Sequence, residues 1–169
     1  YGLTLSVSGG LANKPRLFDS SNPGTKEHGD PDLGSPNELC GGPGKGEGGK
    51  PDAKGANCES RGNVLIIQEE NDHPEIPDDN VDGGIISFHF EKPLRISKIG
   101  LLDIDEKAFL TVKTRDDSGK ETSTEINVPL LGDNSVQTVK IDTDKVFQID
   151  LHLRRSGAVT FLSFCSTEE

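Results

Sequence analysis

The amino-acid sequence predicts an all-β fold, namely a two-sheet antiparallel β-sandwich, jelly-roll-like, with a long Gly/Pro/Asp-rich loop near the N-terminus. Short β-branched and aromatic segments recur along the later two thirds of the chain, and turn residues separate them. No segment has the apolar period of an amphipathic helix. The 169 residues fit a single domain over 1–169.

The expected strands follow from alternation and β-branched runs. Residues 1–7 alternate, residues 63–68 form a β-branched run, and residues 84–91 place Ile86, Phe88 and Phe90 on one face. Residues 116–120 (Asp-Asp-Ser-Gly-Lys) predict a hairpin turn. Further strands are expected at 94–105 (one strand or two), 109–114, 121–128, 136–141, 146–153 and 159–165.

The same alternation predicts which side chains form the core, and Cys165 is expected to be buried as a small hydrophobe. The predicted core residues are Leu65, Ile67, Phe88, Phe90, Leu102, Ile104, Val112, Val139, Ile149, Leu151, Phe161 and Phe164.

Residues 15–61 form the long loop, because Gly, Pro, Asp, Asn and Lys dominate them. Such a composition buries too little apolar surface to offset the entropy of ordering, so the segment is expected to be an irregular surface excursion. Cys40 and Cys58 bracket its Gly-rich part and predict a disulfide, which requires an oxidising compartment; the alternative is two free thiols. A bound ion is the other feature expected to hold the long loop against the rest of the domain.

The formal charge of −11 argues against nucleic acid and bare anionic membranes as partners, since both bind clustered Lys and Arg. No run approaches the roughly 18 apolar residues that span a bilayer, so no membrane insertion is expected. A chain that starts at Tyr1 and contains no Met is expected to be a processed product or an excised domain.

Carboxylates are the strongest chemical signal. Asp30 and Asp32 lie in the long loop, and Asp103 and Asp105 alternate with apolar residues, so both carboxylates project from one face of a strand. Calcium takes six to eight oxygen ligands at irregular spacing. A structural calcium ion is therefore predicted, although an acidic chain also carries many solvated Asp side chains.

Three further residues complete the predicted calcium ligands: Asp19, Asn37 and Glu69, the last of them at the end of the 63–68 strand. A second acidic group, Asp78, Asp79, Asn80 and Asp82, has a pattern more typical of a solvated turn.

The sequence does not favour an enzyme. Its four histidines lack zinc-ligand spacing, no Ser stands in a nucleophile elbow, and the Gly-rich segment matches no phosphate-binding loop. Paired carboxylates can serve a glycosidase. With no Trp and one Tyr, however, the usual aromatic sugar platform is missing. No catalytic residue is assigned.

Several segments resemble a group of uncharacterised extracellular β-sandwich domains from secreted and surface proteins of marine bacteria and algae. They cover most of the chain: residues 17–20 (LFDS), 29–37 (GDPDLGSPN), 41–44 (GGPG), 62–69 (GNVLIIQE), 100–106 (GLLDIDE), 132–139 (GDNSVQTV) and 156–159 (SGAV). The architecture is also similar to galactose-binding-like carbohydrate modules, which commonly hold a structural calcium. The Cys40/Cys58 pair stands outside this pattern.

Two functional hypotheses follow. The first is a non-catalytic, calcium-stabilised extracellular binding or adhesion module for a glycan or a matrix component. The second is a structural subunit whose long loop docks onto a larger protein assembly, at a cell surface or in an algal organelle. Under the first hypothesis, the protein is expected to be secreted or located at the cell surface.

Overall fold

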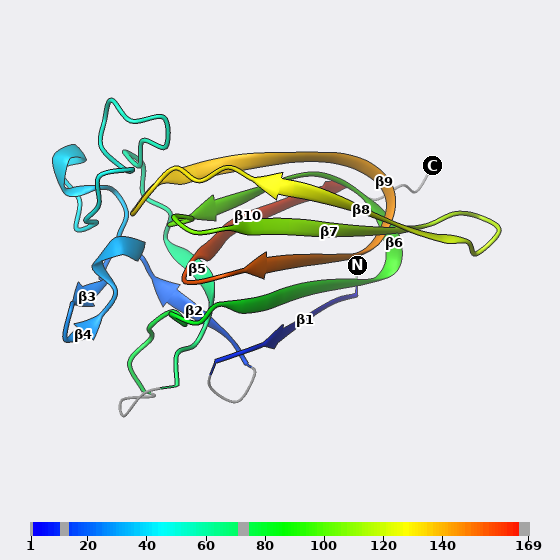
Figure 1. The fold of residues 1–169 in the computed structure, drawn as a ribbon, viewed down its shortest axis with the longest axis horizontal. Helices are drawn as coiled ribbons and strands as arrows, with labels where there is room; N and C mark the ends of the chain where they lie inside the picture. Colours follow the sequence, from blue (N-terminus) through cyan, green and yellow to red (C-terminus); the bar gives the residue numbers. More distant parts are fainter. Residues whose placement is uncertain (1, 11–13, 71–74, 166–169) are drawn as a thin grey trace.

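The computed structural model describes residues 2–10, 14–70 and 75–165, and nearly all regular structure in it is β (Figure 1). Eight strands form one antiparallel sheet in the order β2-β5-β10-β6-β9-β7-β8, with β1 paired to β6 as well. Two short strands, β3 and β4, form a second sheet. The predicted all-β class is confirmed, and no helix in the described ranges is long and apolar enough to cross a membrane.

The strands are β1 Leu3–Ser8, β2 Pro15–Asp19, β3 Gly24–Thr25, β4 His28–Gly29, β5 Asn63–Ile67, β6 Gly84–Leu102, β7 Ala108–Arg115, β8 Glu121–Val128, β9 Val136–Leu153 and β10 Ala158–Cys165. Two single-turn 3₁₀ helices, η2 (Pro31–Leu33) and η3 (Glu38–Cys40), lie in the long loop. The 116–120 turn joins β7 to β8 as predicted, with the Asp116 N–H donating to the Lys120 carbonyl.

The two longest strands change partners along their length. The first half of β6 pairs with β1 and the end of β9, and its second half pairs with β10 and the start of β9. The sequence predicted separate strands at 136–141 and 146–153, yet β9 runs through both. β9 bends between these two segments (Figure 1). Asp142 and Lys145 lie at the bend with φ of 50° and 56°, and the β6–β9 register shifts opposite them.

One hydrophobic core serves both halves of the sheet. Ile86 and Phe88 from the first half of β6 are buried in the same cluster as Ile99 and Leu101 from its second half. Ile149 and Leu151 of β9 and Leu110 and Val112 of β7 join them. The bends in β6 and β9 therefore fold the sheet around a shared interior, and the alternation predicted for residues 84–91 is confirmed.

Two of the core predictions at β10 are wrong. Phe161 is 37% exposed, and Cys165 is exposed as well. A bulge between Val159 and Phe161 adds one residue to β10, so strict alternation fails beyond it and Phe161 turns outward. Leu65 and Phe164 are only partly buried but pack against the core, and the remaining predicted core residues are buried.

The long loop is more ordered than its composition predicts. Its first five residues form β2, which pairs with β5. Phe18 of β2, and Leu33 farther along the loop, pack with Ile66 of β5, Leu102 of β6 and other residues in a second buried cluster. The loop thus covers one end of the large sheet with a small hydrophobic core of its own, at the left in Figure 1.

Candidate functional site

Carboxylates from distant segments converge at the end of the sheet that the long loop covers. Asp30 precedes η2, while Asp78 and Asp79 precede β6, and one carboxylate oxygen of each lies within 4.8 Å of the others. Asp30 also accepts the Asp32 N–H at 3.0 Å, which caps η2. Asp79 is 5% exposed, and its Oδ2 accepts the Gly157 N–H at 2.5 Å.

Burial is the largest cause of the pKa shifts at this centre. It raises the pKa of Asp79 well above its usual range, and the negative charge of Asp30 adds to the effect. Burial likewise raises the pKa of Asp78 to about 6, with the charges of Asp30 and Glu69 adding to it. Two or more ionised carboxylates this close repel one another in a poorly solvated setting, so the centre favours protons or a cation.

Asp103 lies directly after β6 and is 4% exposed. Burial raises the pKa of its carboxyl to about 8; the N–H donated by Asn134 at 2.5 Å opposes this shift, while the charges of Asp30 and Asp32 add to it. Its φ of 62° is in the left-handed region, which Asp and Asn tolerate better than most residues. In this conformation the Asp103 carboxylate accepts the Asn134 N–H.

Four more exposed or half-buried carboxylates extend the centre outward. Partial burial, followed by the charges of Asp30 and Asp133, raises the pKa of Asp32. Partial burial and Asp133 raise that of Asp105. We call the whole set the acidic cluster: Asp30, Asp32, Glu69, Asp78, Asp79, Asp103, Asp105 and Asp133.

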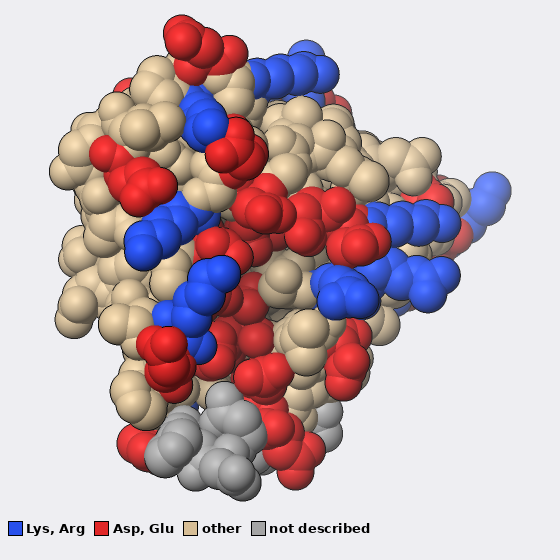
Figure 2. All heavy atoms as spheres, turned by 60° about the vertical axis from the view of Figure 1, so that its left-hand side comes forward, with Lys and Arg blue, Asp and Glu red and all other residues tan. Residues whose placement is uncertain are grey.

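Figure 2 views the molecule with the loop-covered end turned forward. Asp and Glu side chains form a nearly continuous band across this face, and Lys and Arg side chains lie at its sides. Oxygen-rich ligand sets drawn from several loops are the kind that hard cations such as Ca²⁺ prefer. The arrangement is chemically suited to hold a divalent cation.

The structure brings five of the seven predicted ligands into the acidic cluster: Asp30, Asp32, Glu69, Asp103 and Asp105. The other two have local roles. Asp19 is exposed, and its carboxylate accepts the N–H and the hydroxyl of Ser21 at 3.0 and 2.6 Å. Asn37 is buried and caps η3, with its Oδ1 accepting the Leu39 N–H.

Sequence reasoning missed Asp78, Asp79 and Asp133, and the prediction that residues 78–82 form a solvated turn is wrong for its central part. Asp79 and Asn80 are buried, because Asp79 bridges antiparallel to Gln68 and so extends the end of β5. The Asn80 side chain donates to the Gly83 carbonyl at 2.6 Å. The available signal was a polar pair, Asp79 and Asn80, a few residues before the long strand β6.

A buried asparagine network holds the loop beside the acidic cluster. Asn134 donates its side-chain amide to the carbonyls of Asp32 and Gly34 at 2.8 and 2.6 Å. Its Oδ1 accepts from the amides of Asn37 at 2.8 Å and Asn57 at 3.3 Å. All three asparagines are at most 1% exposed. The predicted Cys40–Cys58 disulfide is also present and closes the loop farther out.

The comparisons with known proteins leave the family open. No protein family matches the chain, and no curated protein matches it significantly in sequence. Among solved structures, the enzymatically active domain of tailspike protein 4 from bacteriophage CBA120 matches with 10% identity and a TM-score of 0.36. That match covers 96% of this chain but only 18% of the tailspike chain, and a likeness this distant carries no argument about function.

Proposed function

We propose that this chain is a non-catalytic, calcium-stabilised binding module with a jelly-roll-like sandwich architecture, acting outside the cell on a glycan or matrix component. The observation that carries the calcium part is the convergence of Asp30, Asp78 and Asp79 around one point, with the buried Asp103 adding its charge to the same centre. The Cys40–Cys58 disulfide supports an oxidising compartment.

The physical case for a cation rests on buried charge. Asp79 and Asp103 are almost completely shielded from water, and a buried carboxylate is unfavourable unless it is paired, protonated or bound to metal. Within the described residues neither of them forms a salt bridge with Lys, Arg or His. Calcium would neutralise them while drawing together loop and strand-end segments that otherwise repel.

The alternative, a structural subunit that docks through its loop, assumed that such a long irregular segment needs a partner to order it. In the structure the loop is held by contacts within the chain itself, namely the asparagine network, the disulfide and the cluster containing Phe18 and Leu33. This weakens the argument for a docking partner and favours the binding module.

A calcium titration tests the proposal. Isothermal calorimetry on the metal-free chain should show one site, and the melting temperature should rise with millimolar CaCl₂, with MgCl₂ a poor substitute because Mg²⁺ demands strict octahedral geometry. Asp78→Ala should remove most of the response, because Asp78 is one of the three carboxylates that converge on one point. Asp117→Ala is the matched control, because Asp117 lies in the β7–β8 turn and pairs with Lys145. No heat of binding and no change in melting would refute the calcium site.

A further inference from the structure

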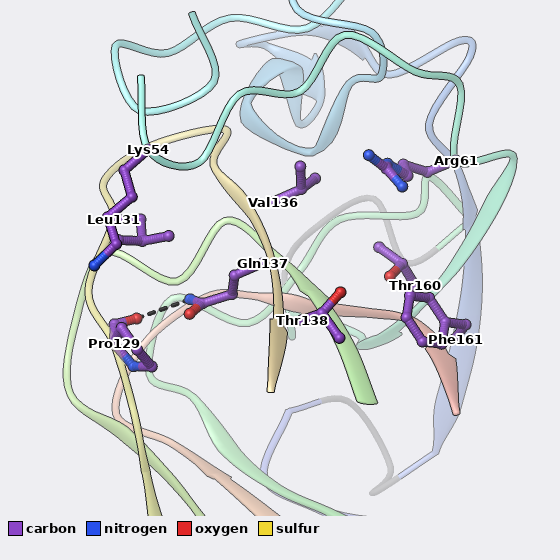
Figure 3. A pocket seen from close by; sticks show the side chains of 9 residues that line it. All are labelled: Lys54, Arg61, Pro129, Leu131, Val136, Gln137, Thr138, Thr160 and Phe161. Carbon is purple, nitrogen blue, oxygen red and sulfur yellow. Dashed lines mark hydrogen bonds between the residues drawn. The ribbon is translucent and has the colours of Figure 1, made fainter. Parts of the chain in front are cut away.

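A hollow of about 370 Å³ opens where the long loop meets the outer face of β9 and β10, and the acidic cluster does not include it (Figure 3). Lys54 and Arg61 reach it from the loop. Thr138 comes from β9, and Thr160 and Phe161 come from β10. In the close-up, Arg61 lies above Thr160 on one side of the hollow, and Lys54 lies beside Leu131 on the other.

Arg61 lacks a full set of partners. Its Nε is buried and has no hydrogen-bond partner in the described part of the chain. Its ion pair with Glu59 is long, at 3.8 Å, and the Glu59 side chain is 82% exposed. A buried guanidinium N–H without an acceptor is unfavourable, so an anionic acceptor in the hollow would relieve it. Lys54 is exposed and adds a second positive charge on a chain of net charge −11.

Phe161 supplies an aromatic surface beside these cations. It pairs with Gly100 across the sheet, and its ring occupies the space that a Cβ at Gly100 would need. Thr138 pairs with Gly100 from the other side, so Thr138, Gly100 and Phe161 form one row. The Lys98 ammonium lies 5.8 Å from the ring centroid. The bulge before Phe161 therefore turns its ring outward and pairs it with Gly100 in this row.

We propose that this hollow binds an anionic saccharide, one that carries carboxylate or sulfate groups. The acidic groups pair with Arg61 and Lys54, the C–H face of a sugar ring packs on Phe161, and sugar hydroxyls bond to Thr138 and Thr160. This inference deepens the binding role proposed above and rests on it, but it does not depend on the calcium site.

An acidic peptide would satisfy the cations but fits the surroundings less well. The hollow lies on the face of paired strands, with β9 and β10 both flanking β6, so it offers no free strand edge for an extended peptide to join. Threonine hydroxyls beside an exposed ring match a polyhydroxylated ring better than a peptide backbone. The saccharide is therefore the favoured ligand.

Calorimetry of the intact chain in calcium-containing buffer tests the inference with four probes: tetragalacturonate, a sulfated chondroitin tetrasaccharide, neutral cellotetraose and a penta-glutamate peptide. We expect at least one acidic tetrasaccharide to bind, and which of them binds identifies carboxylate or sulfate as the source of charge. Added NaCl should weaken this binding. Cellotetraose and penta-glutamate should bind at least tenfold more weakly.

Variants locate the site. Arg61→Gln should weaken binding by about tenfold or more, as expected for the loss of one charge-assisted hydrogen bond. Phe161→Ala should weaken it by a similar factor, because the sugar ring loses its packing surface. Lys54→Gln removes an exposed charge and keeps the test valid should Arg61→Gln fail to fold. Lys120→Gln, in the β7–β8 turn, is the matched control. Equal binding of the neutral sugar or the peptide, or unchanged binding in all three site variants, would overturn the inference.

The two proposals fail in distinguishable ways. Loss of saccharide binding with an intact calcium response in melting overturns only the saccharide site. If the chain binds the saccharide but its melting does not respond to calcium, the saccharide site is supported and the calcium site is refuted.

Discussion

Asn134 donates its backbone N–H to the Asp103 carboxylate at 2.5 Å, while its side chain holds the long loop through Asp32 and Gly34. Both residues adopt left-handed backbone conformations, with φ of 62° for Asp103 and 61° for Asn134. One asparagine thus connects the strand-end acid, the β8–β9 connection and the loop. The metal-ligand geometry proposed above depends on this connection.

Asn134→Ala should lower the free energy of unfolding by about 3 kcal/mol, because it leaves buried carbonyls and amides without partners and places alanine at a positive φ. Asn134→Gly tolerates the backbone conformation and isolates the loss of side-chain hydrogen bonds. Exposed Asn127→Ala is the control. Denaturant melts should rank alanine below glycine and both below the control; an unchanged midpoint for Asn134→Ala would mean that the network does not hold the loop.

Phe90→Ala should cost about 3–5 kcal/mol, as expected when a buried Phe is truncated, since Phe90 is 5% exposed and contacts Phe164 with ring centroids 6.1 Å apart. Phe161→Ala should cost less than about 1 kcal/mol because its ring is outside the core. Urea denaturation of the two variants measures the difference. Equal losses would place Phe161 back in the interior.

The contrast between these two phenylalanines shows where sequence reasoning works and where it stops. Alternation correctly placed Phe88 and Phe90 inside, because a strand without bulges has a period of two. The bulge before Phe161 has no clear local signal. The burial of polar residues is harder still to predict from the sequence. The burial of Asp79 depends on its pairing with Gln68, and that of Asn134 depends on a loop about a hundred residues away.

The dependence of polar side chains on distant contacts also explains why only some of the predicted metal ligands were correct. Asp30, Asp32, Asp103 and Asp105 stood out because acids alternate or cluster next to recognisable strands. Asn37 has a similar position in the sequence, but its side chain is used up by the cap of η3 and the asparagine network. Proximity along the chain does not reveal which oxygens remain available for an ion.

Removing the disulfide with Cys40→Ala/Cys58→Ala should affect the loop more than the whole domain. Chain entropy gives an upper bound of about 3 kcal/mol for a bridge between residues 18 apart. The buried asparagines already anchor both ends of this segment, so we expect about 1 kcal/mol in denaturant melts and faster proteolysis between the two positions. Alkylation of the native chain should label neither cysteine; two reactive thiols there would contradict the bridge.

Asp79→Asn should have opposite effects with and without calcium. The substitution keeps an oxygen acceptor for the Gly157 N–H while removing a buried charge beside Asp30. In EDTA the variant should therefore melt at a higher temperature than the parent chain, whereas its gain from calcium should be smaller. Asp117→Asn, an exposed change, should alter neither value. A variant that is destabilised equally in both buffers would show that Asp79 is structural only.

The stability of the metal-free chain should fall as the pH rises. The pKa of Asp103 is raised to about 8, that of Asp78 to about 6, and that of Asp79 well above its usual range, whereas an unfolded Asp has a pKa near 3.9. Between about pH 4 and pH 8 the metal-free folded state therefore binds more protons than the unfolded state. Its free energy of unfolding must then fall as the pH rises through this range.

Calcium should remove that dependence, because a bound cation takes the place of the protons and returns the carboxyls to their ionised form. Melting curves from pH 5 to pH 8 in EDTA should shift steadily downward, while curves in millimolar CaCl₂ should stay nearly level, so that the benefit of calcium is largest at pH 8. Asp103→Asn should flatten the EDTA series, because it removes a buried carboxyl whose pKa is raised to about 8. Parallel pH profiles with and without calcium would mean that the ion and the protons do not compete for the acidic cluster.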